Sequence, residues 1–240
     1  MRENYMKKQN VKQTPIIRDT DLIYSYKEQW FTGFAPCFQN GIYSLACCKG
    51  NKKTGGMRHS VCENIESGNA VWVISIAGRD IQSEMHNRSG IDYRSGDAIY
   101  LAKIIKALTL EEYSANYSER SDAIYLFKNG TIIRNESSQD IHMTEEDKRT
   151  DCTLELGWSQ SKIFSQFKQI IMADEYYIFK PGCRVCDTSL DVRRGYTFLK
   201  GGKTRVEELR GLLKKSEFAF VSGDDPFNNG NMNGKENCRK

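Results

Sequence analysis

The apolar positions of this chain are concentrated in two segments near its middle. Residues 70–77 (AVWVISIA) form a near-continuous apolar run, rich in β-branched and aromatic side chains and bounded by Gly68 and Gly78. This pattern predicts a buried strand. Residues 97–108 predict a second strand, which leads directly into Thr109 and Glu112. Because a spacing of three between Thr and Glu is that of a capping box, a helix is expected to begin there.

Shorter patterns predict the remaining elements. Further strands are expected at residues 22–26, 41–48, 122–127, 130–134 and 175–179, and helices at 58–66 and 206–215. Asn129-Gly130 between two of these strands is typical of a hairpin turn. The fold class is therefore predicted as α+β and mostly β, a curled sheet of five to seven strands or a small barrel with short peripheral helices. A single domain is expected at 21–221, between a polar N-terminal arm (1–20) and a disordered C-terminal tail (222–240).

Composition supports a globular chain. Of 240 residues, 39% are hydrophobic and 28% charged, which is enough apolar material for a sizeable core. No apolar run approaches the roughly 18 residues of a membrane span, and the N-terminus does not resemble a signal peptide. The eight cysteines are accordingly expected to be reduced thiols in a cytoplasmic protein with no membrane partner. The net charge of +4 permits nucleic-acid binding without requiring it.

Several motifs resemble those of the nucleotide modification associated domain proteins, in the same order along the chain. The matching segments are residues 24–26 (YSY), 32–36 (TGFAP), 44–49 (SLACCK), 68–75, 98–113, 120–125 (RSDAIY) and 171–179. The chain departs from that pattern at Cys37, Asn69 and Lys180. The resemblance implies a pathway of DNA base modification linked to phages or mobile elements, more firmly than it implies a reaction. The order of strands also resembles the small PUA, ASCH and EVE barrels, which implies a base-binding pocket at the barrel mouth.

An aromatic-rich segment offers the chemistry for binding a base. Trp30 and Phe34 lie beside the flexible Gly33, and stacking on such rings contributes about 1–3 kcal/mol per base. The predicted ligand-binding residues are Trp30, Thr32, Phe34 and Tyr43, with Lys49, Arg58 and Arg79 as phosphate contacts. The aromatic side chains are equally consistent with plugging one end of the core. Likewise the basic clusters, at 49–58, 193–194 and 200–205, are also typical of solvated loops.

Nucleophilic and acid–base chemistry has few candidates. Cys47 and Cys48 are adjacent in a predicted strand, so one side chain should face the core and the other a pocket. Asp122 opens a predicted strand and is a candidate acid or base. A reactive thiol needs a base close by, and the sequence identifies none, so a buried thiol is the competing interpretation. No nucleotide-cofactor, serine-triad or zinc-deaminase motif is present, and no cofactor is predicted.

One spacing suits a metal. Cys183 and Cys186 form a Cys-x-x-Cys pair that could bind zinc, with His59 and Cys62 as a second pair. Because His-x-x-Cys is the weaker half of a zinc site, two ordinary loop cysteines are favoured and no bound metal is expected.

Two classes of function remain. The first is a module that binds DNA or a nucleotide and recognises a modified base in a DNA-modification or phage-defence pathway, with base-modification enzymes as candidate partners. The second is an enzyme that modifies a nucleobase or nucleotide, with its active site in residues 32–49. The first is favoured because no set of residues completes a reaction mechanism.

Overall fold

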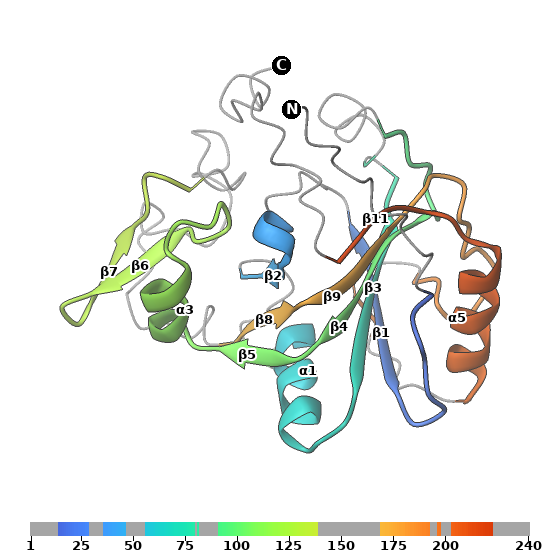
Figure 1. Cartoon of the computed structure of the whole chain (residues 1–240), viewed down its shortest axis with the longest axis horizontal. Coiled ribbons are helices and arrows are strands. Elements are labelled where there is room, and N and C mark those ends of the chain that lie inside the picture. The colour runs from blue at the N-terminus through green and yellow to red at the C-terminus, as the bar shows by residue number, and fades with distance from the viewer. Residues whose placement is uncertain are drawn as a thin grey trace, which may run out of the picture.

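The computed structural model describes residues 14–28, 36–46, 56–79, 81, 91–138, 169–192, 196–197 and 203–222. Its main sheet has the strand order β10-β1-β3-β4-β9-β11 (Figure 1). The bounds of these strands are β10 (Tyr196–Thr197), β1 (Leu22–Glu28), β3 (Val71–Ala77), β4 (Ala98–Ile104), β9 (Glu175–Phe179) and β11 (Phe218–Val221). β1 and β3 are parallel, and every other neighbouring pair is antiparallel.

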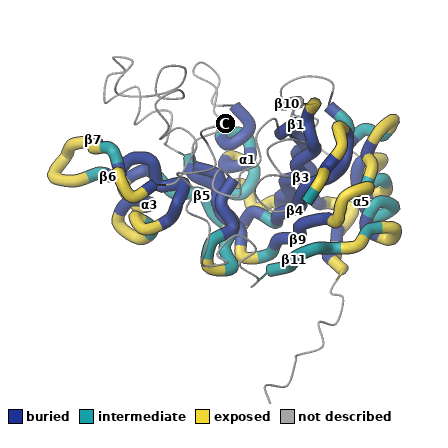
Figure 2. The backbone as a smooth tube through the Cα atoms, turned by 90° about the horizontal axis from the view of Figure 1, so that it is seen from above, coloured by how far each residue is buried: buried dark blue, intermediate teal, exposed yellow. Residues whose placement is uncertain are grey.

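Side chains of the main sheet alternate between two cores, as the two-residue period of a strand requires. On one face Tyr24, Val73 and Tyr100 pack with Met57 and Val61 of α1 (Gly56–Glu66). The opposite face is covered by α5 (Lys203–Lys215), and its core combines apolar residues of strands and helix, among them Ile23, Trp72, Ile74, Leu101, Val206, Leu209 and Leu213. The strands β1, β3, β4 and β9 are therefore mostly buried, whereas the outer sides of the helices are exposed (Figure 2).

The two central strands continue into a second sheet. After β4, Ile105 interrupts the strand and β5 (Lys106–Leu108) follows, and Asp174 separates β8 (Ile170–Ala173) from β9 in the same way. β5 pairs with β8, and β8 also pairs with β2 (Tyr43–Leu45), which gives the order β2-β8-β5. The described sheets do not close into a barrel, because β10 and β11 remain edge strands. The architecture is thus α+β and mostly β with short helices, and the small barrel, one of the two predicted forms, is not what the described strands build.

Local sequence signals place a small helix and a hairpin at one end of the molecule. The helix α3 (Leu110–Tyr117) begins with the predicted capping box, in which the Thr109 side chain accepts from the Glu112 backbone N–H and the Glu112 side chain accepts from the Thr109 N–H. β6 (Tyr125–Lys128) and β7 (Thr131–Arg134) form the predicted hairpin. Its turn is left-handed at both Asn129 (φ 51°) and Gly130 (φ 76°), which explains the Asn-Gly sequence.

Two predicted strands are shorter in the structure. β2 begins only at Tyr43, because Gln39–Gly41 forms a 3-10 turn in which Asn40 and Gly41 both have positive φ. Asp122 does not open a strand, since it lies in the loop between α3 and β6.

Of the predicted N-terminal arm, residues 14–20 are described, and Ile17 is buried in the core under α5. In the part of the chain that the structure describes, no helix has the length and apolar character to cross a membrane.

Candidate ligand-binding site

The short strand β2 lies between two buried polar clusters. Tyr43 and Leu45 face the core beneath α1, whereas Ser44 points the opposite way, toward the loop that follows α3. Cys37 pairs with Ser44 through two backbone hydrogen bonds of 2.8 and 2.9 Å, so residues 37–44 form a closed loop. Both clusters are therefore held by the segment that follows the aromatic-rich sequence 29–35.

The first group, the tyrosine cluster, consists of Tyr26, Tyr43, Tyr100, Tyr176 and Phe38, all fully buried. The ring of Phe38 lies 5.1–5.4 Å, centroid to centroid, from Tyr43, Tyr100 and Tyr176. The Tyr100 hydroxyl hydrogen-bonds those of Tyr26 and Tyr43, at 3.2 Å for Tyr43. Three phenolic oxygens and a set of edge-packed rings thus converge at one end of the main sheet.

A carboxylate borders this cluster. Glu28 ends β1, is only 3% exposed, and accepts a hydrogen bond of 3.4 Å from the Ser75 hydroxyl. Burial raises the pKa values of Tyr26, Tyr43 and Tyr100, and the nearby charge of Glu28 raises all three further. The phenols are therefore neutral at physiological pH and act as hydrogen-bond donors and acceptors, not as phenolate nucleophiles.

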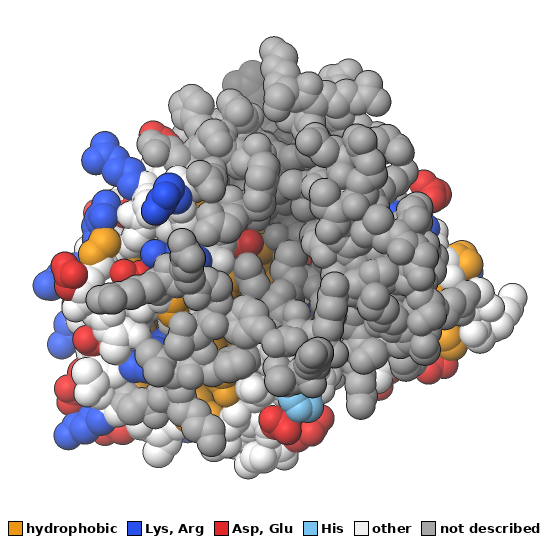
Figure 3. Space-filling model, turned by 180° about the vertical axis from the view of Figure 1, so that it is seen from behind, with side chains coloured by type: hydrophobic (Ala, Val, Ile, Leu, Met, Phe, Trp, Pro, Cys, Tyr) orange, Lys and Arg blue, Asp and Glu red, His pale blue; other side chains and the backbone are white. Residues whose placement is uncertain are grey.

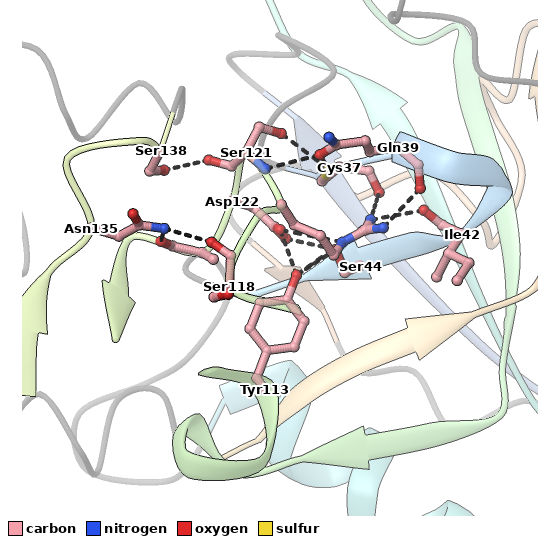
Figure 4. Close-up of polar contacts among 12 residues, drawn as sticks. Cys37, Gln39, Ile42, Ser44, Tyr113, Ser118, Ser121, Asp122, Asn135 and Ser138 are labelled. Carbon is pink, nitrogen blue, oxygen red and sulfur yellow. Dashed lines mark hydrogen bonds and ion pairs between the residues drawn. The ribbon is translucent and has the colours of Figure 1, made fainter. Parts of the chain in front are cut away.

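The second group, the Arg120 network, is built around a buried ion pair (Figure 4). Arg120 is 2% exposed and Asp122 0%, and Arg120 Nε lies 3.8 Å from Asp122 Oδ1. Ser44 donates to Asp122 Oδ2 at 2.8 Å and Tyr113 donates to Oδ1 at 2.6 Å. Arg120 in turn donates from Nη1 to the Gln39 carbonyl at 2.8 Å and from Nη2 to the Ile42 carbonyl at 2.9 Å.

All three nitrogens of Arg120 and both carboxylate oxygens of Asp122 therefore have partners. Burial alone would lower the pKa of Arg120, but neighbouring Cys37, Tyr113 and Asp122 raise it above its ordinary value. The network fastens loop 37–44 to the loop after α3. The structure accordingly gives Asp122, a candidate acid or base in the sequence, a role in positioning the backbone.

Cys37 lies within the same network but is not reactive. Its Sγ is 3.1 Å from the Ser121 hydroxyl and fully buried. Burial, and next the charge of Asp122, raise the pKa of Cys37 to about 11. The thiol stays protonated at neutral pH, so it contributes packing and a weak hydrogen bond.

An outer layer of contacts joins the network to the β6–β7 hairpin. Ser138 donates to the Ser121 carbonyl, and the Asn135 amide donates to the carbonyls of Ser118 and Ala123 at 2.8 Å (Figure 4). The hairpin is thereby fixed relative to β2.

The structure describes only some of the predicted site residues. The predicted ligand-binding residues Trp30, Thr32, Phe34 and Lys49 and the candidate nucleophiles Cys47 and Cys48 lie outside the described residues. Tyr43 belongs to the tyrosine cluster. Arg58 is 1% exposed, and its Nη1 donates to the carbonyls of Ala46 (2.5 Å) and Gln169 (3.0 Å), so it joins α1 to β2 and β8 rather than facing solvent. Arg79 is exposed immediately after β3.

The four candidate zinc ligands have partners of other kinds. His59 contacts Gln169 (2.8 Å) and Glu63 (3.3 Å), while Cys62 is buried on α1, and burial raises its pKa to about 11. Cys183 Sγ hydrogen-bonds Ser216 at 2.7 Å, whereas Cys186 is exposed and accepts from Arg184 at 3.0 Å. Within the described ranges, no three His, Cys, Asp or Glu side chains gather as a metal site would require.

Sequence reasoning missed Glu28, Tyr100 and Arg120 as members of these clusters. Strand alternation could have placed Glu28 on the face of Tyr24 and Tyr26, since all three share one parity in β1. The contacts that Arg120 makes with loop 37–44 lie 76–83 residues away along the chain, and no local pattern indicates them.

Comparison with known proteins adds no relative. No family model, no curated protein and no solved structure matches the chain. The function proposed below therefore rests on the residues themselves and, for the modified base and its pathway, on the motif resemblance described in the sequence analysis.

Proposed function

We propose that the protein binds a nucleobase, within DNA or as a nucleotide, at the end of the main sheet where the tyrosine cluster lies, and that Trp30 and Phe34, predicted from the sequence as binding residues, contribute to the same site. In this proposal the recognised base is a modified one, in a DNA-modification or phage-defence pathway. The observation that carries it is the convergence of aromatic rings, three phenolic hydroxyls and the Glu28 carboxylate at one place.

These groups are the ones that base recognition uses. Sites for small planar ligands are mostly apolar and aromatic, with a few polar groups that fix orientation. A base held outside a duplex is stacked on rings and read by hydrogen bonds along its edge. Neutral phenols can donate or accept there, and a carboxylate accepts from an exocyclic amino group.

The same end of the sheet also offers a phosphate contact. The Gly78 N–H donates to the Glu28 carbonyl at 2.7 Å, which places the residues after β3 next to the end of β1. Arg79 follows Gly78 and is exposed. An exposed arginine beside a base site would hold the sugar–phosphate backbone without reading sequence.

Binding is favoured over catalysis by the state of the described thiols. Burial raises the pKa values of Cys37, Cys62 and Cys183, so none of them is a ready nucleophile. In the alternative, an enzyme would use Cys47 or Cys48, and incubation with DNA and nucleotides would yield a new nucleoside mass. That product should vanish in Cys47→Ser or Cys48→Ser, and its appearance would overturn the proposal.

The proposal is tested by binding of modified and unmodified oligonucleotides and free nucleotides to the wild type and isosteric variants. Tyr43→Phe and Tyr100→Phe remove only hydroxyls, and each should weaken binding by roughly three- to tenfold, the usual value of one hydrogen bond. Trp30→Ala and Phe34→Ala should weaken it more, by roughly 1–3 kcal/mol per lost stack.

Tyr93→Phe is the matched control. Tyr93 is equally buried in the same core, but its hydroxyl donates to the backbone carbonyl of Phe179 at 2.7 Å and not to a phenol of the tyrosine cluster. It should lose stability without losing affinity. Equal losses of affinity in all three Tyr→Phe variants, or affinity losses that only follow thermal stability, would show that the cluster is core and not a site.

A further inference from the structure

A second buried arginine lies under α5, on the face of the main sheet opposite the tyrosine cluster. Arg205 is the third residue of α5 and is 3% exposed. Its Nη2 donates to the Ser25 hydroxyl of β1 at 2.5 Å. Among the described residues, its Nε and Nη1 have no hydrogen-bond partner. Since Nε carries one N–H and Nη1 two, three of the five guanidinium donors are unused.

This arrangement is costly for the protein alone. A buried guanidinium stays charged, and each unmade hydrogen bond leaves desolvation uncompensated. Burial lowers the pKa of Arg205, and the charge of Glu208 opposes that shift. Glu208 does not accept a hydrogen bond from Arg205. Its Oε2 instead accepts from the Ser189 backbone N–H at 2.9 Å and from the Ser189 hydroxyl.

The position of Arg205 coincides with the beginning of a helix. Ser25, its one partner, is paired in register with Thr197 of β10, the strand that precedes α5. The first turn of α5 contains Lys203, Thr204 and Arg205 and no acidic residue. The first N–H groups of a helix lack partners within it and carry partial positive charge, which favours an anion.

The exposed surface of α5 is not a basic patch, so Arg205 is not simply one member of a positively charged surface. Lys203 lies 4.0 Å from Glu207, and Arg210 pairs with Asp19 at 2.6 Å, so positive and negative side chains alternate there. Figure 3 shows Lys, Arg, Asp and Glu side chains intermixed along the left side of that view. The unusual group is the buried one.

We propose that the first turn of α5 and Arg205 form a binding site for a phosphate group, with Ser25 orienting the guanidinium. A phosphate presents several acceptor oxygens, and arginine is the side chain best matched to them. Lys203 and Thr204, both exposed in the first turn, supply the outer contacts. This site is independent of the base-binding proposal, because it lies on the other face of the sheet.

The test compares the wild type with Arg205→Met and Lys214→Met in inorganic phosphate and in potassium chloride of equal ionic strength. Lys214→Met removes an exposed charge from the far end of the same helix and is the matched control. Phosphate should raise the melting temperature of the wild type and of Lys214→Met by about 2–4 °C over chloride. Arg205→Met should show no such rise, and calorimetry should show at least about tenfold weaker phosphate binding.

Two further arms make the result decisive. If Arg205→Met does not fold, Arg205→Lys keeps the charge but loses the fork, and its phosphate shift should fall below half that of the wild type. A mononucleotide and a single-stranded oligonucleotide, tested in the same way, show whether the phosphate is terminal or part of a chain. Equal phosphate shifts in the wild type and the Arg205 variants, or no shift in the wild type with any of these probes, would overturn the site.

Discussion

Arg120 and Arg205 are buried to almost the same extent, but they differ in how many hydrogen-bond partners the protein gives to each guanidinium group. Arg120 donates to three backbone carbonyls and lies beside Asp122, whereas Arg205 has a single described partner, Ser25. Their pKa values move in opposite directions, upward for Arg120 and downward for Arg205. The hydrogen bonds of Arg120 fasten two loops together, whereas the unused donors of Arg205 are the basis of the phosphate site proposed above.

The largest expected effect is on Arg120. Arg120→Met leaves Asp122 buried without its cation and frees three carbonyl groups, so the free energy of unfolding should fall by about 3–5 kcal/mol. Urea denaturation measures it. A loss below about 1 kcal/mol would mean that the network is not what holds loop 37–44.

A smaller loss is expected from Tyr113→Phe. This change removes the 2.6 Å hydrogen bond to Asp122 while preserving the ring. Because the acceptor is charged, the free energy of unfolding should fall by roughly 1.5–3 kcal/mol. The double variant Tyr113→Phe with Asp122→Asn should lose less than the sum of the two single changes, and full additivity would argue against the contact.

Arg205→Met should behave differently from Arg120→Met. In buffer without phosphate it removes a charge with no described counter-ion, and methionine fills similar apolar space. The free energy of unfolding should therefore be unchanged or higher than that of the wild type. A loss comparable to that of Arg120→Met, measured in the same urea series, would remove the distinction between the two arginines.

The last prediction concerns pH. The pKa of Cys37 is raised from 9.0 to about 11, so the folded state favours the protonated thiol. Its contribution is fully present below pH 9 and is lost as the pH rises toward 11. Cys37→Ala should be destabilised at pH 7 by lost packing, but its stability should fall less steeply than that of the wild type between pH 9 and 11. Parallel pH profiles would contradict this assignment.

Local signals in the sequence were sufficient for part of the fold. The capping box of Thr109 and Glu112 and the Asn129-Gly130 turn act within a few residues, and the structure confirms both. The near-continuous apolar run at residues 70–77 likewise predicted the central strand β3. The interruption at Ile105 has no such signal, since it arises where the strand crosses from one sheet to the other.

The clusters could not be predicted in the same way. Arg205 belongs to a basic sequence, 200–205, that is typical of a solvated loop, yet its side chain is buried against β1. Its hydrogen-bond partner there, Ser25, lies 180 residues earlier in the chain, so no local pattern indicates the contact. Arg58 is another buried arginine from a basic sequence, and it donates to the backbone carbonyls of Ala46 and Gln169, which are distant along the chain. Burial of a charged side chain depends on tertiary neighbours, which one sequence does not reveal.

The order of strands in the main sheet has a consequence for the synthesis of the chain. Both edge strands, β10 and β11, come from the last part of the described chain, and they cover β1 and β9. Until residues 196–221 leave the ribosome, the long strands β1 and β9 each have an open row of backbone donors and acceptors. Such edges pair readily with other chains. A nascent or truncated chain that stops before residue 196 is therefore expected to aggregate, even though the central strands β3 and β4 and the helix α1 are already complete.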